Sequence, residues 1–355
     1  MKITEIDKNF VQQCADDNTV WIDSKSEYFK IYGVFYDSER KEFRRVPYEI
    51  AEKTNEGVAI LSKNTAGGRI KFDTNSLNIS IKCTFLNNGI MTHMPLTGSN
   101  GFAVYINGIF HVKFSPEWTI FNSNDKYISF TAKAALPKTE NVKEVEIYFP
   151  LYGGVSELYI GIDDNCKIRQ ASEYKYKNPI VYYGSSITQG GCASRPGNDY
   201  QGHIERWLNA DYVNLGFSGS CMGEIIMADY IISLCPSVVV MDYDHNAPDL
   251  EHLKKTHYPF YKRIRNAIPD TPIIFITKPD YRSDEKLNKP RREVIRNTYL
   301  KSIKDGDKLT EFIDGETLFG IENYDACTVD GCHPNDLGFY RMAKIICPFV
   351  KKFIK

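Results

Sequence analysis

The sequence has almost no excess of charge, with 44 Lys and Arg residues against 45 Asp and Glu residues and a formal net charge of -1. A protein that binds nucleic acid through bulk charge needs a concentrated basic surface, whereas the basic residues here are scattered among acidic ones. The chain also lacks any apolar run near the ~20 residues that a membrane-spanning helix requires. We therefore expect neither a nucleic-acid partner nor a membrane partner.

Cysteine pairs of the Cys-x-x-Cys type are absent, although the chain has nine cysteines. The first residues, Met1–Asp7, mix charges and lack the apolar segment of a signal peptide. An odd number of cysteines without a secretion signal favours reduced thiols over a disulfide framework. These features predict a cytoplasmic protein.

Metal and phosphate motifs are incomplete. The segment Asp242–Asn246 begins like a calcium loop, but Ala247 and Leu253 stand where that loop needs Gly and a bidentate Glu. The segment Gly184–Gly190 lacks the Gly-Lys-Ser/Thr ending of a phosphate-binding loop. We expect no metal and no cofactor.

The first 170 residues have the texture of an all-β domain. At roughly 100–200 residues per domain, a chain of this length predicts two domains. Short alternating runs lie between Gly, Asn and Pro turns, at 70–73, 77–83, 102–108, 128–131 and 145–149. The pair Asn107-Gly108 stands between two such runs and predicts a tight hairpin. We expect a β-sandwich, jelly-roll-like in architecture, over residues 1–170.

Residues 178–355 alternate between apolar, strand-length runs and amphipathic stretches. Continuous apolar runs are typical of parallel strands that helices cover on both faces. The expected strands are 180–183, 212–215, 238–241, 273–277 and 309–313, and the expected helices lie near 200–208, 223–234, 250–268, 290–304 and 338–353. The pattern predicts an α/β domain of three layers, α/β/α, with a parallel sheet.

Candidate catalytic residues follow several of these runs, at the edge of the sheet where α/β domains bind their ligands. Ser186 follows the first strand, and Asp330 and His333 precede the last helix on a single turn. A serine needs a base to take its proton, and the base needs a group that fixes its tautomer. The backbone N–H groups of Ser186 and Gly219 and the side-chain amide of Asn246 would supply donors for an oxyanion.

These blocks, Gly184-Ser-Ser186-Ile-Thr188, Gly219, Asn246 and Asp330-x-x-His333, resemble the SGNH (GDSL-type) hydrolases in order and spacing. The α/β-hydrolase alternative lacks its Gly-x-Ser-x-Gly elbow here. Upstream, Met94–Tyr105 is similar to the Gly-x-Asp-Leu-Tyr signature of a β-sandwich domain that precedes some of these hydrolases. The resemblance implies that Ser186 is the nucleophile, His333 the base, Asp330 its orienter, and Gly219 and Asn246 the oxyanion residues.

Three positions depart from the family pattern. Ser185 replaces an Asp that is outside the triad, Asp244 replaces the usual Gly of the third block, and Ala103 replaces the Asp of the upstream signature. Because Asp244 replaces this Gly, the backbone that leads to Asn246 could follow a different path from the one in the family. The same departure makes His245 a candidate for a polar role.

Each candidate also has a structural interpretation. Ser186 could cap the helix that follows it, and Asn246 could cap the helix that begins near Asp249. Gly219 could serve only a tight turn.

Substrate contacts are the least constrained feature. Arg195 and Tyr200 lie in the loop after the nucleophile and are candidates together with His245, the alternatives being a structural salt bridge for Arg195 and a core position for Tyr200. The resemblance implies a metal-independent serine esterase that forms an acyl-enzyme and removes acetyl groups from a small-molecule or oligosaccharide ester. The alternatives are a short-chain lipid or aryl ester hydrolase, or a carbohydrate-binding protein with an inactive hydrolase domain. The oligomeric state stays open.

Overall fold

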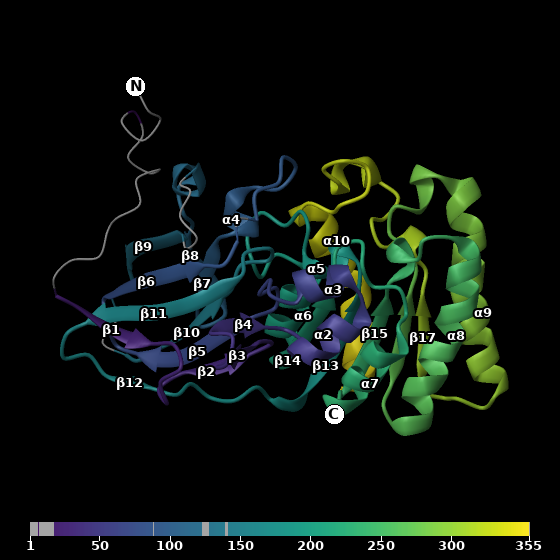
Figure 1. Cartoon of the computed structure of the whole chain (residues 1–355), viewed down its shortest axis with the longest axis horizontal. Helices are drawn as coiled ribbons and strands as arrows, with labels where there is room; N and C mark the ends of the chain where they lie inside the picture. Colours follow the sequence, from purple (N-terminus) through teal and green to yellow (C-terminus); the bar gives the residue numbers. More distant parts are fainter. Residues whose placement is uncertain (1–5, 7–17, 88, 123–127, 139–140, 355) are drawn as a thin grey trace.

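The computed structural model describes residues 6, 18–87, 89–122, 128–138 and 141–354. Figure 1 shows two halves side by side, with antiparallel sheets at one end and a parallel sheet flanked by helices at the other. The antiparallel part ends at Arg169 and the parallel sheet begins at Tyr176.

The first half is built from two antiparallel sheets and a small hairpin. One sheet has the order β1 (Thr19–Asp23), β11 (Val155–Asp163), β6 (Asn78–Phe85) and β9 (Ile128–Ala135). The other has the order β12 (Ile168–Arg169), β5 (Arg69–Thr74), β10 (Lys143–Tyr148), β7 (Phe102–Ile106) and β8 (Ile109–Phe114), with β2 (Lys30–Tyr32) also paired to β5. The hairpin consists of β3 (Phe35–Asp37) and β4 (Glu42–Arg44).

Inward-facing residues of the two sheets share one hydrophobic core, in which Ile81 and Ile160 meet Phe72 and Val104. The predicted β-sandwich is confirmed. The turn between β7 and β8 has positive φ at both central residues, 50° at Asn107 and 77° at Gly108, as a tight hairpin requires.

The second half has a five-stranded parallel sheet with the order β14-β13-β15-β16-β17. The strands are β13 (Tyr176–Gly184), β14 (Ala210–Gly216), β15 (Val238–Asp242), β16 (Ile273–Ile276) and β17 (Thr310–Ile313). The helices are α5 (Ser186–Gln189), α6 (Tyr200–Leu208), α7 (Ile225–Ser233), α8 (Leu250–Ala267), α9 (Glu285–Lys304) and α10 (Asp336–Phe353). Helix α9 begins before the predicted start at 290, because the Asp284 side chain caps it by accepting from the Leu287 amide.

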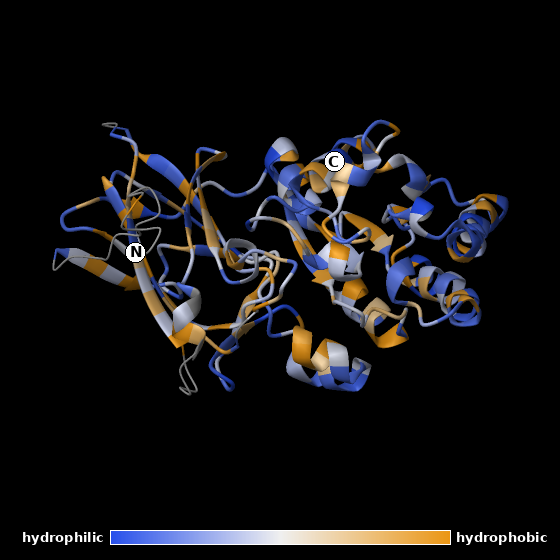
Figure 2. Cartoon of the chain, turned by 90° about the horizontal axis from the view of Figure 1, so that it is seen from above, coloured by the Kyte–Doolittle hydropathy of each residue, from blue (hydrophilic) through white to orange (hydrophobic). Residues whose placement is uncertain are grey.

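Alternate residues of the central strands face opposite layers. Ile180 and Tyr182 of β13 belong to the core beneath α6 and α10, whereas Val181 and Tyr183 belong to the core beneath α7 and α8. In Figure 2 the strands are largely hydrophobic, while the outermost helices α8 and α9 are mostly hydrophilic. The predicted three-layer α/β/α domain is confirmed. Among the residues that the structure describes, no helix is long and apolar enough to cross a membrane.

Three short helices in the first half were not predicted: α2 (Tyr48–Thr54), α3 (Glu56–Leu61) and α4 (Leu96–Ser99). They differ from the expected all-β texture because a helix of four to seven residues is too short to show helical periodicity in the sequence. Ala51 of α2 and Val58 of α3 are buried in the core that contains α7. A segment of the first half therefore covers part of the second.

Buried polar contacts join the two halves. Arg45 donates to the Asn64 carbonyl in its own half and to the Gly216 carbonyl at the end of β14. Arg69 of β5 donates to the Asp211 carboxylate and to the Tyr212 carbonyl at 3.1 Å. Neither arginine is exposed to any appreciable extent. The first half is thus fixed against the strand that borders the nucleophile strand.

Candidate active site

Ser186, His333 and Asp330 form a continuous row of contacts. The Ser186 hydroxyl oxygen lies 2.9 Å from Nε2 of His333, and Nδ1 of the same ring lies 2.7 Å from Oδ2 of Asp330. Ser186 is the first residue of α5, directly after β13, and the other two residues lie in the loop before α10. The structure therefore brings together the three residues that the sequence proposes as a triad.

The turn before Ser186 is shaped by its neighbours. A Cβ atom on Gly184 would lie 2.1 Å from the Thr188 hydroxyl and 2.4 Å from the Asp242 carbonyl oxygen, so only glycine fits. The side chain of Ser185 accepts a hydrogen bond from the Ile187 amide at 3.2 Å and caps α5. The interpretation of Ser186 as the helix cap is wrong, because Ser185 takes that role and leaves the Ser186 hydroxyl available to His333.

The loop that carries Asp330 and His333 is held by its own hydrogen bonds. Oδ1 of Asp330 accepts from the amides of Cys332 at 3.0 Å and His333 at 2.7 Å. Partial burial opposes ionisation, but the bonds from the His333 amide and ring and from the Cys332 amide lower the pKa of Asp330 to about 2. The carboxylate is therefore ionised at neutral pH and already in contact with the imidazole.

The candidate oxyanion residues lie at the ends of neighbouring strands. In the sheet register, Gly184 of β13 stands opposite Gly216 of β14 and Asp242 of β15. Gly219 and Asn246 follow these two strands, so both lie at the same sheet edge as Ser186. The structure gives the positions of these donors, and their role in catalysis stays a prediction.

Gly219 and Asn246 each have a clear local geometry. Gly219 has a φ of +68°, which favours glycine, while a Cβ atom there would meet nothing within 4 Å. Asn246 Nδ2 donates one hydrogen to the Phe217 carbonyl at 2.8 Å, which leaves its second hydrogen for another acceptor. The interpretation of Asn246 as a helix cap is wrong, because Asp249 caps α8.

Asp244, the departure in the third block, is fully buried in a short 3-10 helix, Asp244–Asn246. Its Oδ1 accepts from Nε of Arg291 on α9 at 2.8 Å. Nη2 of Arg291 also donates to the Ala247 carbonyl at 2.9 Å. An ion pair thus holds the backbone on both sides of Asn246.

His245 connects this third block to the catalytic loop. Its Nε2 lies 3.1 Å from Oδ1 of Asp280, and its Nδ1 lies 3.8 Å from Sγ of Cys332. The ring is mostly buried, at 10% side-chain exposure. These contacts indicate a positioning role, and the predicted contact of His245 with substrate stays a prediction.

Arg195 and Tyr200, which the sequence proposes as substrate contacts, make contacts within the protein. The Arg195 guanidinium lies 3.8 Å from the centre of the Phe110 ring on β8, so it packs against the first half of the chain. Its predicted contact with substrate stays a prediction. For Tyr200 the prediction is wrong: the side chain is 0% exposed, and its hydroxyl donates to the buried Asp242 carboxylate at 3.2 Å.

Two features of the site were missed in the sequence. His93, from the first half, lies beside His333 with 5.5 Å between ring centres. Asp242 lies under the nucleophile turn, where burial raises its pKa to about 7 although Thr188 and Tyr200 donate hydrogen bonds to it. No local signal marks His93, whereas the end of an apolar strand could have drawn attention to Asp242.

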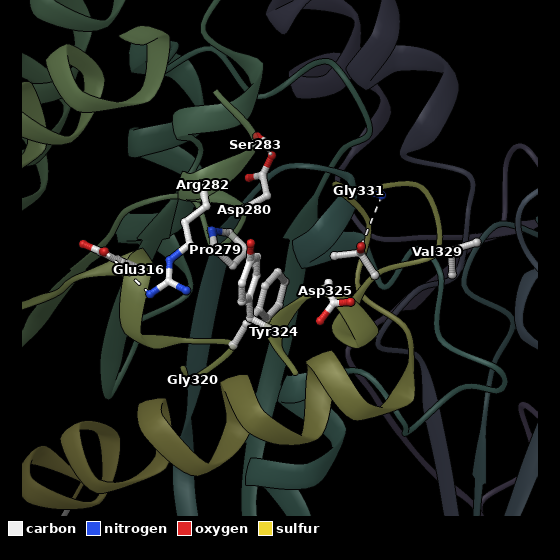
Figure 3. A pocket seen from close by; sticks show the side chains of 12 residues that line it. Pro279, Asp280, Arg282, Ser283, Glu316, Gly320, Tyr324, Asp325, Val329 and Gly331 are labelled. Atoms are coloured by element: carbon white, nitrogen blue, oxygen red, sulfur yellow. Dashed lines mark hydrogen bonds and ion pairs between the residues drawn. The ribbon is translucent and has the colours of Figure 1, made fainter. Parts of the chain in front are cut away.

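A cavity of about 380 Å³ borders the catalytic loop at Gly331. Figure 3 shows the side chains of Arg282, Glu316 and Tyr324 around it, with Asp280 also on its wall. Tyr324 is 41% exposed, and the Arg282 guanidinium lies over its ring, 4.6 Å from the ring centre. The cavity therefore offers an aromatic face beside paired polar groups.

The fold and the arrangement of its strands define an SGNH-type α/β/α domain, which an antiparallel domain precedes in the sequence. Residues 177–351 match the model of the GDSL-like lipase/acylhydrolase family. Residues 19–168 match the model for the N-terminus of SGNH hydrolase-type esterases, known by its GxDLY signature. The chain belongs to the GDSL-like lipase/acylhydrolase family and carries this N-terminal domain.

Solved structures with the same architecture extend over nearly the whole chain. A protein from Bacteroides ovatus described as a GDSL-like lipase is 28% identical, with a TM-score of 0.83 over 95% of this chain and 99% of the other. A salicylyl-acyltransferase from a tetracycline biosynthetic pathway is 17% identical, with a TM-score of 0.77 over 95% and 98%. An acetyl xylan esterase from the rumen bacterium Butyrivibrio proteoclasticus is 14% identical, with a TM-score of 0.56 over 94% and 98%. No curated protein matches the chain.

Proposed function

We propose that the protein is a serine esterase that removes short acyl groups, acetyl above all, from hydroxylated substrates such as sugars. The observation that carries the proposal is the row of contacts from Ser186 through His333 to Asp330, with separations of 2.9 and 2.7 Å. This geometry is what a serine hydroxyl needs to become a nucleophile.

The reaction proceeds in two halves. The Ser186 oxygen attacks the ester carbonyl carbon while Nε2 of His333 takes the hydroxyl proton, and Asp330 stabilises the imidazolium that forms. Collapse of the tetrahedral intermediate breaks the bond to the alcohol oxygen, which receives the proton from Nε2. Water then attacks the acyl-enzyme by the same route, and the acid is released with Ser186 restored.

The developing oxyanion is stabilised by the amides of Ser186 and Gly219 and by the Asn246 side chain. These donors are held before substrate arrives, since Asn246 is fixed by the Phe217 carbonyl and the Ser218 amide donates to the Gln189 side chain at 3.0 Å. A preorganised donor needs no rearrangement at the moment when charge appears.

Two observations support a sugar as the alcohol. The cavity at Gly331 combines the exposed Tyr324 ring with Arg282 and Glu316, and a sugar ring stacks on an aromatic face while its hydroxyls bind polar groups. Among the structures of similar fold is the acetyl xylan esterase named above. The alternatives are a short-chain lipid or aryl ester, and a binding protein without hydrolase activity.

The test begins with hydrolysis of 4-nitrophenyl acetate by the wild type and by Ser186→Ala. We expect activity in the wild type and its loss in the variant, and full activity in the variant would refute the nucleophile assignment. Mass spectrometry of acetylated oligosaccharides before and after treatment, beside a series of 4-nitrophenyl esters of increasing acyl length, then identifies the substrate. Loss of 42 mass units, about one acetyl group, from a sugar supports the proposal, whereas a preference for longer acyl chains without any sugar deacetylation favours the lipid esterase.

A further inference from the structure

Two groups of three metal-ligating side chains occur in the part of the chain that the structure describes. One consists of His93, Asp330 and His333, and the other of His245, Asp280 and Cys332. In each group, one ligand atom from each residue lies within 4.8 Å of the others. The first group joins the two halves of the chain at the candidate triad.

The position of His93 is fixed by the residues that follow it. Met94 is 5% exposed and packs into the core of the α/β domain. Thr97 donates from its hydroxyl to the Ser194 carbonyl at 2.6 Å, and a Cβ atom on Gly98 would meet the Ala193 carbonyl oxygen at 2.2 Å. The segment that carries His93 is therefore docked closely onto the loop after the nucleophile.

The His93 ring is available for a ligand. It is partly exposed, and it lies against His333 as a tilted ring pair, with 5.5 Å between centres and 54° between planes. Within the described ranges, neither ring nitrogen of His93 makes a hydrogen bond or an ion pair to a protein group. One of the two nitrogens, depending on the tautomer, can thus offer its lone pair to a cation.

We propose that His93, His333 and Asp330 bind a zinc ion that reversibly inhibits the enzyme, an inhibition that rests on the esterase function proposed above. Two imidazole nitrogens and a carboxylate oxygen are ligands that zinc prefers, at about 2.0–2.2 Å each, with a fourth position left to water. Ligand atoms of a tetrahedral site are roughly 3.3 Å apart, so small side-chain rotations close a group that already lies within 4.8 Å.

Inhibition follows from the way in which His333 is used. Its Nε2 lies against the Ser186 hydroxyl and its Nδ1 against Asp330. A zinc ion on Nε2 takes the lone pair that should receive the serine proton, and an ion on Nδ1 displaces the contact that orients the ring. Coordination through either nitrogen therefore stops the reaction, and removal of the ion restores it.

The second group is a weaker candidate for the same ion. Lys278 Nζ lies 3.5 Å from Oδ2 of Asp280, so a cation already occupies the neighbourhood of that carboxylate. His245 and Asp280 also lie 3.1 Å apart and are mostly buried. A dication would have to enter a confined space that a lysine already neutralises.

The experiment measures zinc binding and inhibition separately. Wild type, His93→Ala, His93→Gln, His111→Ala and Cys332→Ser are dialysed against zinc chloride, and bound metal is determined by elemental analysis. Hydrolysis of 4-nitrophenyl acetate is followed with and without zinc in each protein, and then after addition of EDTA. His111 is the matched control, because it lies on β8, donates to or accepts from no catalytic residue, and belongs to neither group.

We expect the wild type and His111→Ala to bind about one zinc ion and to lose activity, which EDTA restores. Both His93 variants should need at least about tenfold more zinc for half-inhibition, each compared with its own metal-free rate, and should lose the bound ion in dialysis. Equal zinc sensitivity in the His93 variants overturns the proposal, and loss of the ion in Cys332→Ser alone assigns it to the second group. Urea unfolding of each variant shows that it is folded. Bound metal after dialysis tests the zinc site even if 4-nitrophenyl acetate is not a substrate.

Discussion

Arg291 of α9 is paired with Asp244, and both side chains are almost completely buried, at 6% and 0% exposure. The pair lies directly beside Asn246, whose backbone it helps to fix. The residue that departs from the family pattern in the third block is therefore part of a structural support for the candidate oxyanion residue.

Removal of the arginine should be costly. Arg291→Met leaves the Asp244 carboxylate buried without its counter-ion, and such a loss costs about 3–5 kcal/mol of unfolding free energy. Arg296→Met, on the same helix, removes a half-exposed partner of Glu293 and should cost less than about 1 kcal/mol. Urea unfolding followed by circular dichroism measures both. Similar midpoints for the two variants would contradict the structural role of the pair.

Asn246→Ala should lower kcat by ~10²–10³ while KM changes little, because the amide acts mainly on the charge of the transition state. Steady-state kinetics with 4-nitrophenyl acetate measures both constants. His245→Ala is the matched variant, since it changes the adjacent residue and its contact with Asp280. If Asn246→Ala has no kinetic effect while His245→Ala has a large one, the donor is His245 and the assignment of Asn246 is wrong.

The triad residues should contribute unequally. Ser186→Ala and His333→Ala should each remove most of kcat, and the double variant should be little worse because the two residues act as a unit. Asp330→Ala should cost less than either, since Asp330 orients the imidazole without transferring a proton. The same ester assay, extended to single-turnover conditions for slow variants, measures these rates. Additive losses in the double variant would show that the two side chains act independently.

The contribution of Asp242 to stability should fall as the pH rises from about 4 to about 7. The pKa of Asp242 is raised by burial to about 7, so in this range the unfolded chain loses the proton that the folded protein retains. Each such group lowers the unfolding free energy by about 1.4 kcal/mol per pH unit within its window. Burial raises the pKa of Glu205 to about 8, and this group acts in the same direction as Asp242. Burial also lowers the pKa of His203 to about 4 and that of His257 to about 3, and these two groups act in the opposite direction below pH 6.5.

Asp242→Asn should remove its share of this slope while keeping a side chain that can still meet Thr188 and Tyr200. Urea unfolding at several pH values between 4 and 8 measures the slope in the variant and the wild type. An unchanged slope would mean that Asp242 is ionised in the folded protein.

The sequence predicted the parts of the fold that depend on local patterns. Fully buried strands such as β15 and β16 are continuous apolar runs, and this signal needs no tertiary information. The row from Ser186 to Asp330 was predictable because one loop carries both partners of the serine. Beyond pattern, the prediction used the meeting of strand ends at one edge of a sheet, and the roles of the three residues came from the resemblance to the SGNH hydrolases.

The missed features depend on contacts between distant segments. His93 reaches the site because Met94 and Gly98 dock on the other half, and nothing near position 93 indicates this. Tyr200 looked accessible because it follows a loop, yet it is the first residue of α6 and points beneath the nucleophile turn. Burial of this kind is decided by tertiary packing and has no signature in a short window.

The core shared by the two halves has a consequence for folding during synthesis. The first half leaves the ribosome earlier. Its residues Ala51, Val58 and Met94 pack against residues after 176, which are synthesised later. Until those residues emerge, apolar side chains and the buried arginines Arg45 and Arg69 remain exposed to water. The nascent first half is therefore a natural client for chaperones that bind apolar surface, and a gene cut at the boundary between the halves would yield two aggregation-prone fragments.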